Sequence, residues 1–425
     1  MTLLVLFGSF VVLLLLGVPI AISLALASVG LLSITANYAT YMIAQRMFAA
    51  LDSSALVAIP GFVLAGAIMS HGGISDRIIK ALRAWVGHLP GGLALVAVAS
   101  CALFAAMSGS SPATAAAVGG TLIPAMVAGG YDKKYAMGVI AAAGTLGILI
   151  PPSITFVLIG VTAGESIGRL FMAGVLPGLL LAAAFAAAAI LIARKRGYQS
   201  DAPATWAERW KASWNAIPGL LLPALVLGSI YGGIATPTEA AIISVFYSLL
   251  VALFIYRELD WPTMQRVLRE SVGITSMIFL IIPAAMVFAM YLTSEQVPQH
   301  VAQWVVDRHL GANGFWIVVM SMFFVMGTFL DAVAIVLITV PILVPIIRAL
   351  DINMIHFAVA MVINMEIAMI TPPVGLNLFV VAGVSNASLG DAVRGVLPFL
   401  AVMILVMIVI IMFPEISLLL ARQVN

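Results

Sequence analysis

Charged side chains are scarce in this sequence. Only 8% of its 425 residues are Asp, Glu, Lys or Arg, whereas about 25% are charged in ordinary soluble domains. Hydrophobic residues make up 63%, and the mean hydropathy is +1.19. Apolar stretches of about 20 residues, long enough to cross a hydrocarbon core, recur from Thr2 to Phe413. These features exclude a soluble globular protein and predict an all-α polytopic membrane protein.

Cysteine, clustered histidine and phosphate-loop motifs are also lacking. The single Cys101 excludes an intramolecular disulfide and a cysteine cluster for a metal. No Gly-x-x-x-x-Gly-Lys-Ser/Thr loop is present, which argues against ATP hydrolysis by this chain. The histidines, at positions 71, 88, 300, 309 and 356, show no metal-ligand spacing, and we predict that they are structural. We therefore expect no organic cofactor and no nucleic-acid partner.

An intramembrane enzyme is the rival interpretation. Such an enzyme needs a nucleophile beside its base, or a metal cluster, inside the bilayer. Ser110 and Ser111 are the candidate nucleophiles, but no histidine is predicted at comparable depth. The sequence therefore favours a protein that is not an enzyme.

Basic residues gather in four short segments, which the positive-inside rule places in the cytoplasm: 77–83, 133–134, 194–211 and 257–269. Between the first two segments lie two short apolar limbs, Leu93–Met107 and Ala113–Ala128, broken at Ser108–Pro112. The limbs either cross the membrane fully or form a re-entrant hairpin. The Gly, Ser and Pro residues favour the hairpin, because non-helical backbone at membrane depth must be buried in protein or line a cavity.

A second pair of short limbs, Phe315–Leu330 and Ala332–Ile347, is broken at Gly327–Asp331. We interpret Thr2–Ile34, which has no charged side chain, as one retained spanning helix that is too long for a secretory signal. With the N-terminus in the cytoplasm, the count of crossings places the C-terminus in the periplasm. The other predicted crossings are Tyr135–Thr162, Arg169–Ala193, Ile217–Gly233, Glu239–Tyr256, Val272–Leu292, Met354–Gly383 and Val393–Phe413.

The two hairpins belong to an internal repeat with an offset of 221 residues. At this offset Pro124 falls on Pro345, Pro151-Pro152 on Pro372-Pro373, and Gly174–Pro177 on Gly395–Pro398. Five predicted crossings separate the hairpins, and an odd number makes the second repeat inverted relative to the first. Inverted repeats with discontinuous helices are typical of secondary transporters, which bind substrate and ion near the membrane midplane.

The hairpin tips and the paired prolines are the predicted binding elements. Paired prolines remove two backbone donors, so the crossings that contain Pro151-Pro152 and Pro372-Pro373 must break within the membrane. The freed carbonyl oxygens suit Na⁺, and helix N-termini suit the carboxylate of an organic anion. We predict two symmetry-related Na⁺ sites, each made by a hairpin tip and the broken helix of its own repeat.

The predicted ligands follow from this arrangement. For Na⁺ they are Ser108, Gly109, Ser110, Ser111, Gly144, Thr145, Gly147 and Pro151 in the first repeat, and Gly327, Thr328, Asp331, Thr371, Pro372, Gly375 and Asn377 in the second. For the substrate they are Ser110, Thr114, Pro152, Asp331, Pro373 and Asn377. Each Ser, Thr or Gly alone is also explained by close packing of membrane helices.

Three acidic residues have competing interpretations. Asp331 is either a ligand or the N-cap of the second limb of its hairpin. Glu239 belongs to Thr236-Pro237-Thr238-Glu239, a capping-box pattern that favours a structural role. Glu366, whose repeat counterpart is Thr145, lies inside a crossing and is the best candidate if transport is coupled to protons.

Two amphipathic stretches lie on the predicted cytoplasmic side. In Ala202–Asn215, Trp206, Trp210 and Trp214 share one helical face, which suits a helix lying in the headgroup plane. Ile74, Ile78, Leu82 and Trp85 make a similar stripe. Either stretch is explained by aromatic anchoring at the membrane surface or by a rigid arm that braces a scaffold against a moving part.

Four segments resemble the large membrane subunit of tripartite ATP-independent periplasmic (TRAP) transporters: Ile59–Gly66, Ser108–Thr114, Gly147–Ser153 and Thr371–Asn377. The resemblance runs nearly from end to end. It implies an elevator-type transporter of the ion transporter superfamily in a bacterial or archaeal inner membrane. It also implies Na⁺-coupled uptake of an organic acid, with a small membrane subunit and a periplasmic substrate-binding protein as partners.

The same interpretation divides the chain into four parts. Residues 1–90 are predicted as scaffold helices and an amphipathic arm, and 91–193 as the transport elements of the first repeat. Residues 194–310 are the connecting amphipathic helix and scaffold helices of the second repeat, and 311–425 its transport elements. The alternative is a stand-alone sodium- or proton-coupled carboxylate carrier, which needs the same hairpins but no binding protein.

Overall fold

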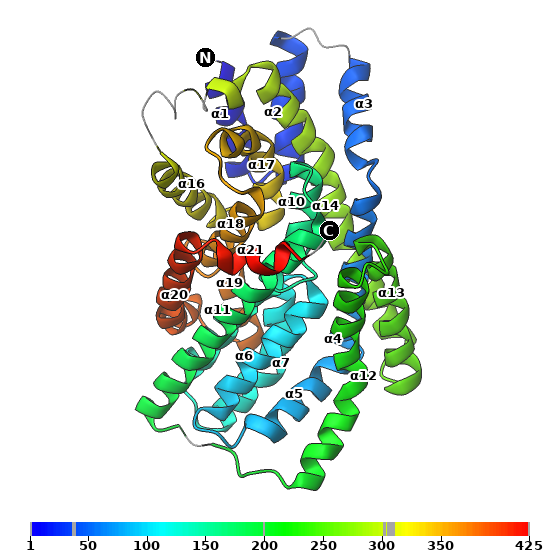
Figure 1. Ribbon diagram of the computed structural model, residues 1–425, viewed down its shortest axis with the longest axis vertical. Coiled ribbons are helices and arrows are strands. Elements are labelled where there is room, and N and C mark those ends of the chain that lie inside the picture. Colours follow the sequence, from blue (N-terminus) through cyan, green and yellow to red (C-terminus); the bar gives the residue numbers. More distant parts are fainter. Residues whose placement is uncertain (1, 36–39, 199, 301–302, 304–310, 424–425) are drawn as a thin grey trace.

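The computed structural model describes residues 2–35, 40–198, 200–300, 303 and 311–423, and within these ranges it is all-helical with no strand (Figure 1). His309, one of the histidines predicted to be structural, lies outside the described residues. Nine helical segments in the described part are long and apolar enough to cross a membrane. The predicted all-α polytopic class is confirmed.

The N-terminal region corrects one prediction. Its elements are α1 (Thr2–Leu15), α2 (Ile20–Thr35), α3 (Thr40–Leu51), the 3-10 turn η1 (Ser54–Val57), α4 (Ala58–His71) and α5 (Ile74–Val86). The single spanning helix predicted over Thr2–Ile34 is wrong, because Gly17 adopts a φ of +80° and Pro19 lacks a backbone donor. The two shorter helices α1 and α2 pack against each other, and α2 also packs against α14.

Both predicted hairpins are present as helix pairs. The first consists of α6 (Gly92–Ser108) and α7 (Ser111–Ala128), which pack against each other and against α8. The second consists of α16 (Ala312–Gly327) and α17 (Ala332–Ala349). These two helices separate away from their tip, because α16 packs mainly against α18 whereas α17 packs against α10 and α14 (Figure 1).

The two proline pairs break their helices as predicted. The first broken helix consists of α8 (Lys133–Gly144), α9 (Leu146–Leu149) and α10 (Ile154–Ala163), and the second of α18 (Met354–Met369) and α19 (Leu376–Ser385). Every residue of α18 is buried, as are all residues of α8 from Tyr135 onward. Helices α8 and α18 therefore lie in the core of the protein, whereas α19 exposes Leu376 and Phe379.

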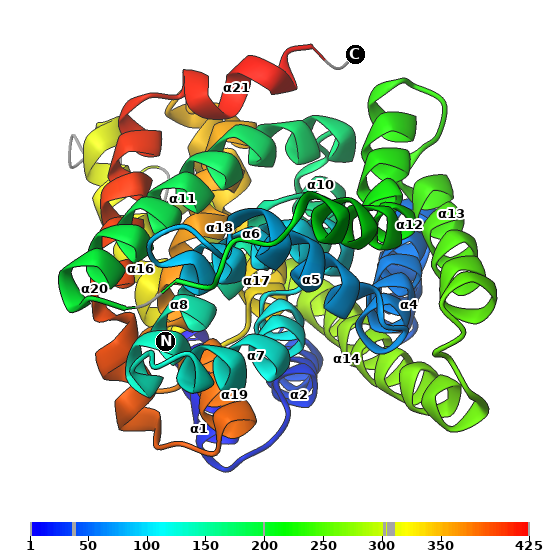
Figure 2. The same ribbon diagram turned by 90° about the horizontal axis from the view of Figure 1, so that it is seen from below.

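The remaining helices surround this core. They are α11 (Ile167–Arg196), α12 (Trp206–Tyr231), α13 (Pro237–Leu250), the π-helical turn η2 (Val251–Ile255), α14 (Trp261–Ser294), α20 (Leu389–Met412) and α21 (Glu415–Ala421). Seen from below, α4, α12 and α13 lie together on one side, and α16 and α20 lie on the opposite side (Figure 2). Thr236 and Glu239 form the predicted capping box at the start of α13.

The predicted separation of the Ala202–Asn215 amphipathic helix from the crossing at Ile217–Gly233 is wrong. Both belong to the single helix α12, because a Thr205–Glu208 capping box starts the helix and no break follows. Trp206, Trp210 and Trp214 remain exposed on its first turns. The tryptophan face therefore continues directly into the apolar part of the same helix.

Two close helix contacts need glycine. A Cβ added to Gly395 on α20 would overlap the carbonyl oxygen of Lys134, and one added to Gly138 on α8 would overlap the backbone of Gly395. A Cβ added to Gly174 on α11 would likewise overlap the carbonyl oxygen of Leu149 and the ring of Phe156. The contact between α8 and α20 is therefore made by bare backbone, and it joins the first half of the chain to the second.

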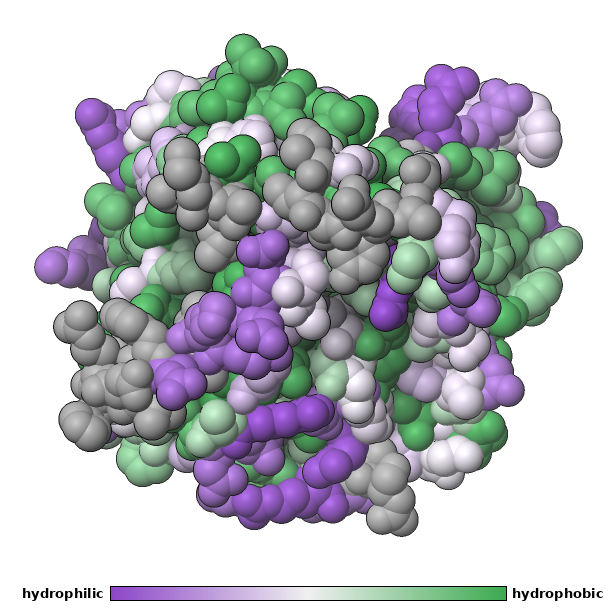
Figure 3. Space-filling model, turned by 90° about the horizontal axis from the view of Figure 1, so that it is seen from above, coloured by the Kyte–Doolittle hydropathy of each residue, from purple (hydrophilic) through white to green (hydrophobic). Residues whose placement is uncertain are grey.

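Large apolar side chains also cover the outside of the molecule. Leu15, Phe246, Phe254 and Met412 are among those that are more than 60% exposed. Seen from above, hydrophobic residues occupy much of the outer edge, and hydrophilic ones lie in the lower middle of the view and at its upper right and left edges (Figure 3). Exposed apolar area on this scale fits a surface that faces lipid.

Candidate functional site

A cavity of about 710 Å³ lies between the tips of the two hairpins. The first tip contributes Ser108 to Ala113, and the second contributes Asp331 to Val333. Other walls come from α4, α7, α10, α14 and α19. Ligand pockets for small molecules typically measure about 300–1,000 Å³, so the cavity is large enough for a small organic molecule.

The cavity walls are mostly apolar, with few charged groups. Asp331 and Glu270 are the acidic residues among its lining, and the described lining residues include no Lys or Arg. The carboxylate of Glu270 on α14 lies 2.9 Å from Nε2 of His71 on α4. Sequence analysis missed this pair, since the two residues are 199 positions apart and no local pattern connects them.

The first hairpin tip is held by its own hydroxyl groups. The hydroxyls of Ser108 and Thr114 lie 2.7 Å apart, and Thr114 donates to the carbonyl oxygen of Ser110 at 2.8 Å. Gly109 has a φ of +60°, which favours glycine. The chain can therefore reverse within a few residues, and α7 starts directly at Ser111 with Pro112 in its first turn.

This tip lies against the broken helix of its own repeat. A Cβ added to Gly147 would lie 2.5 Å from the carbonyl oxygen of Ser110, and one added to Gly109 would lie 2.9 Å from that of Pro152. Gly144 likewise packs directly on Ala115 of α7. The structure thus brings the tip and the first proline break together, as the sequence predicted.

The second tip contacts its own broken helix in a similar way. The backbone N–H of Val374 donates to the carbonyl oxygen of Thr328 at 3.3 Å, and Gly327 packs against Ala368 of α18. The hydroxyls of Thr328 and Thr371 donate within their own helices, to the carbonyl oxygens of Val325 and Ile367. Gly375, with a φ of +57°, starts α19 directly after the break.

A cluster not predicted from the sequence joins the two repeats. The Ser111 hydroxyl lies 2.8 Å from Oε2 of Glu366, 3.1 Å from the carbonyl oxygen of Gly144 and 2.7 Å from Nδ2 of Asn377. The side chains of Ser111, Glu366 and Asn377 are all fully buried. We call these three residues with the Gly144 carbonyl the Ser111 cluster. Thr145, the repeat counterpart of Glu366, donates instead to Ala142 in its own helix turn.

The predicted substrate residues divide into two groups. Ser110 and Asp331 line the cavity. Thr114, Pro152, Pro373 and Asn377 are not among its lining residues, and Thr114 and Asn377 are fully buried. The cavity therefore meets the predicted substrate site only at the two hairpin tips.

The cap interpretation of Asp331 leads to a prediction. Oδ1 of Asp331 accepts from the backbone N–H of Ala334 at 3.0 Å, so the N-cap is present. We expect Asp331→Ala to lower the free energy of unfolding by about 0.5–2 kcal/mol, whereas Asp331→Asn, which keeps the acceptor, changes it little. Thermal unfolding of both purified variants measures this difference. Equal destabilisation by both changes would contradict the role of Asp331 as a cap. If Asp331→Asn is stable but has lost uptake, the negative charge of Asp331 is needed at the transport site.

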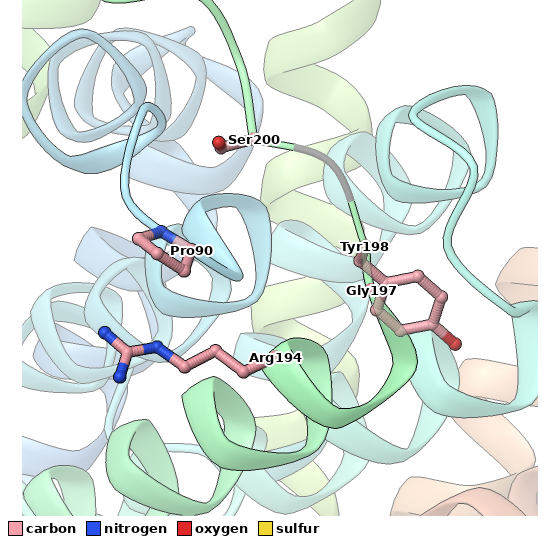
Figure 4. A pocket seen from close by; sticks show the side chains of 5 residues that line it. All are labelled: Pro90, Arg194, Gly197, Tyr198 and Ser200. Atoms are coloured by element: carbon pink, nitrogen blue, oxygen red, sulfur yellow. The ribbon is translucent and has the colours of Figure 1, made fainter.

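A second cavity of about 560 Å³ lies at the end of α11, beside the residues that precede α6 (Figure 4). It is lined by Pro90, Arg194, Gly197, Tyr198 and Ser200. The Tyr198 hydroxyl accepts from the backbone N–H of Asp132 and from Arg196. None of the residues predicted to bind sodium or substrate lines this cavity.

Comparison with known proteins gives a family match over most of the chain. The family model described as "Tripartite ATP-independent periplasmic transporter, DctM component" matches residues 7–416. A solved structure with a similar fold is the YdaH transporter of Alcanivorax borkumensis, with a TM-score of 0.54 and 14% identity. That similarity covers 84% of this chain and 86% of the other, and it concerns the fold alone.

Curated relatives are similar to this chain over most of its length. The C4-dicarboxylate TRAP transporter large permease protein DctM of Pseudomonas aeruginosa is 45% identical over 377 residues, 88% of each chain. The isethionate TRAP transporter permease protein DctMQ of Oleidesulfovibrio alaskensis is 40% identical over 97% of this chain, which spans only 65% of that longer relative. The sialic acid large permease protein SiaM of Vibrio cholerae is 34% identical over 95% of both chains.

Proposed function

Because this chain belongs to the DctM family of tripartite ATP-independent periplasmic transporters, we propose that it takes up a small organic acid and that a sodium gradient drives this uptake. The family is one of transporter permeases, so the chain is not an enzyme. As a member of this family it is a multi-pass protein of the inner membrane. The observation that carries the proposal is the cavity between two hairpin tips, each packed against a proline-broken helix.

The sodium part of the proposal rests on backbone oxygens. At Ile150–Ser153, which is buried, and at Ile370–Gly375, where Pro372 to Val374 are exposed, the helical ladder is interrupted. Carbonyl oxygens freed in this way can replace the hydration shell of an ion. The tips bring further oxygens, from Ser110 in the first repeat and Thr328 in the second. We assign one sodium ion to each tip and break, with the ligands predicted from the sequence.

The substrate part rests on the cavity and on relatives. Helix α7 starts at the first tip, and helix N-termini attract anionic groups, whereas the N-terminus of α17 at the second tip is already capped by the Asp331 carboxylate. Since the described lining residues include no Lys or Arg, the N-terminus of α7 and the serine hydroxyls of the first tip are the groups that receive the acid. Relatives are named for C4-dicarboxylate, isethionate and sialic acid, all of which are anionic.

The partners proposed are a small membrane subunit and a periplasmic substrate-binding protein, as in the tripartite systems for which the family is named. An elevator-type motion would carry residues 91–193 and 311–425 against a scaffold of 1–90 and 194–310, with the N-terminus in the cytoplasm. Packing supports this division, because α4 packs against α13 and α14 whereas α8 packs against α7 and α20. A stand-alone carrier would instead work without either partner.

The test is uptake by proteoliposomes that contain the chain with its membrane partner and binding protein. We expect accumulation of a C4-dicarboxylate, isethionate or sialic acid only with an inward sodium gradient. Two ions moving down a tenfold gradient would support about 100-fold accumulation. Uptake that ignores sodium and follows pH would contradict sodium coupling, and uptake without the binding protein would favour the stand-alone carrier.

A further inference from the structure

The Ser111 cluster places a carboxylate in the core without a basic partner. Glu366 has no exposed surface, and no ion pair of the described residues includes it. Basic residues on the helices packed against α18 lie near helix ends, as Arg348 does on α17 and Arg394 on α20. Burial of a carboxylate is costly unless a partner compensates its charge or a proton removes it.

Counting hydrogens shows that the cluster has too few donors. The Ser111 hydroxyl has one hydrogen, so it cannot donate to both Oε2 of Glu366 and the Gly144 carbonyl. The Asn377 amide already donates to Ser111 and to the carbonyl oxygen of Ala141. Oε1 of Glu366 and Oδ1 of Asn377 are buried and have no hydrogen-bond partner. Acceptor oxygens are therefore in excess, which points to a positively charged ligand.

A proton alone does not correct this excess. A proton on Oε2 of Glu366 would pair that atom with Ser111, but Oε1 and the Asn377 oxygen would stay unpartnered. A metal cation, in contrast, contacts several oxygens at once. The atoms available as metal ligands are carboxylate, amide, hydroxyl and carbonyl oxygens, which hard cations prefer.

We propose that Glu366 is the anionic ligand of a sodium site that joins the two repeats at the Ser111 cluster. Glu366 comes from α18, Asn377 from α19 and Ser111 from the first hairpin, so the ion holds this hairpin against the second broken helix. Ser111, Gly144 and Asn377 are among the ligands assigned above to the sites within single repeats, and this proposal moves them to one site between the repeats. The choice of sodium rests on the proposed function, whereas the cation site itself rests on the cluster.

Sodium binding to the purified full chain tests the site without any transport assay. Radioactive sodium is titrated onto the wild type and onto Glu366→Gln, which keeps the size of the side chain and removes its charge. We expect the variant to bind about one ion fewer per chain, or to bind it at least about tenfold more weakly. Thermal unfolding in NaCl against choline chloride should show correspondingly less stabilisation by sodium in the variant.

Asp391→Asn is the matched control. Asp391 lies on α20 at the surface and pairs with Lys134 at 3.2 Å, so its replacement should leave the number of bound ions unchanged. If Glu366→Gln does not fold, Glu366→Asp replaces it, since this variant keeps the charge but withdraws it by one methylene group. Weaker sodium binding in Glu366→Asp supports the site, and unchanged binding overturns it.

Two outcomes separate this inference from the proposed function. If the wild type and Glu366→Gln bind the same number of ions with equal affinity, the site at Glu366 is overturned while sodium-driven uptake stands. If the wild type binds no sodium at all, both proposals are overturned.

Discussion

Gly147→Ala is expected to raise the sodium concentration for half-maximal uptake by about 10- to 100-fold, the range found when the groups that orient metal ligands are lost. The added Cβ would lie 2.5 Å from the carbonyl oxygen of Ser110 and 2.8 Å from Cα of Ser111. Both are backbone atoms of the first tip, so no side-chain rotation relieves the contact. The tip must therefore move away from the proline break, and the oxygens of the proposed sodium site move apart.

The matched control is Gly120→Ala on α7. Nothing lies within 4 Å of a Cβ added there, although Gly120 is also a helical glycine of the same hairpin region. Alanine favours a helix by about 1 kcal/mol over glycine, so this change should be neutral or slightly stabilising. Sodium-dependent uptake by the two variants in proteoliposomes gives the comparison. If Gly147→Ala shows the sodium dependence of the wild type, the contact between tip and break does not form an ion site.

Gly395→Ala is expected to reduce the yield of folded protein sharply. The added Cβ would overlap the carbonyl oxygen of Lys134 in the first turn of α8. Overpacking of a tight contact usually costs about 1–3 kcal/mol and sometimes more, and here the obstacle is backbone on both sides. Because α8 is almost completely buried, it has little room to move away from α20.

Gly390→Ala serves as the control for this change, because it lies on the same helix and its added Cβ would come no closer than 3.9 Å to another atom. Size-exclusion profiles and thermal unfolding of the two purified variants measure the difference. A Gly395→Ala protein that is as monodisperse and as heat-stable as Gly390→Ala would show that the close approach of α8 and α20 is not required.

Local chemistry made much of the architecture predictable. Pro151 and Pro372 each begin a pair of residues without backbone donors, so both helix breaks follow from the sequence alone. The missed break between α1 and α2 carried the same kind of signal in Gly17 and Pro19, but the uncharged run around them concealed it. The opposite error concerned α12. Its sequence changes from polar to apolar after Asn215, which led to a prediction of two separate helices, but the structure has one continuous helix.

The side-chain contacts of the site could not be predicted in this way. Ser111 and Glu366 are separated by 255 positions, and Ser111 and Asn377 by 266. The repeat suggested that each hairpin works with its own broken helix, and backbone contacts at both tips agree with this pattern. The direct bond between Ser111 and Glu366 depends on how the repeats pack, which the spacing of residues within one repeat does not specify.

The glycine contact between α8 and α20 limits how the protein can change shape. Neighbouring helices usually slide past each other by small adjustments of the side chains between them. At Gly138 and Gly395 no such layer exists, so the inner helices of the two repeats are expected to travel together as one rigid block. Any displacement must then take place along the outer boundary of that block, where α17 meets α14 and α6 meets α4 and α5.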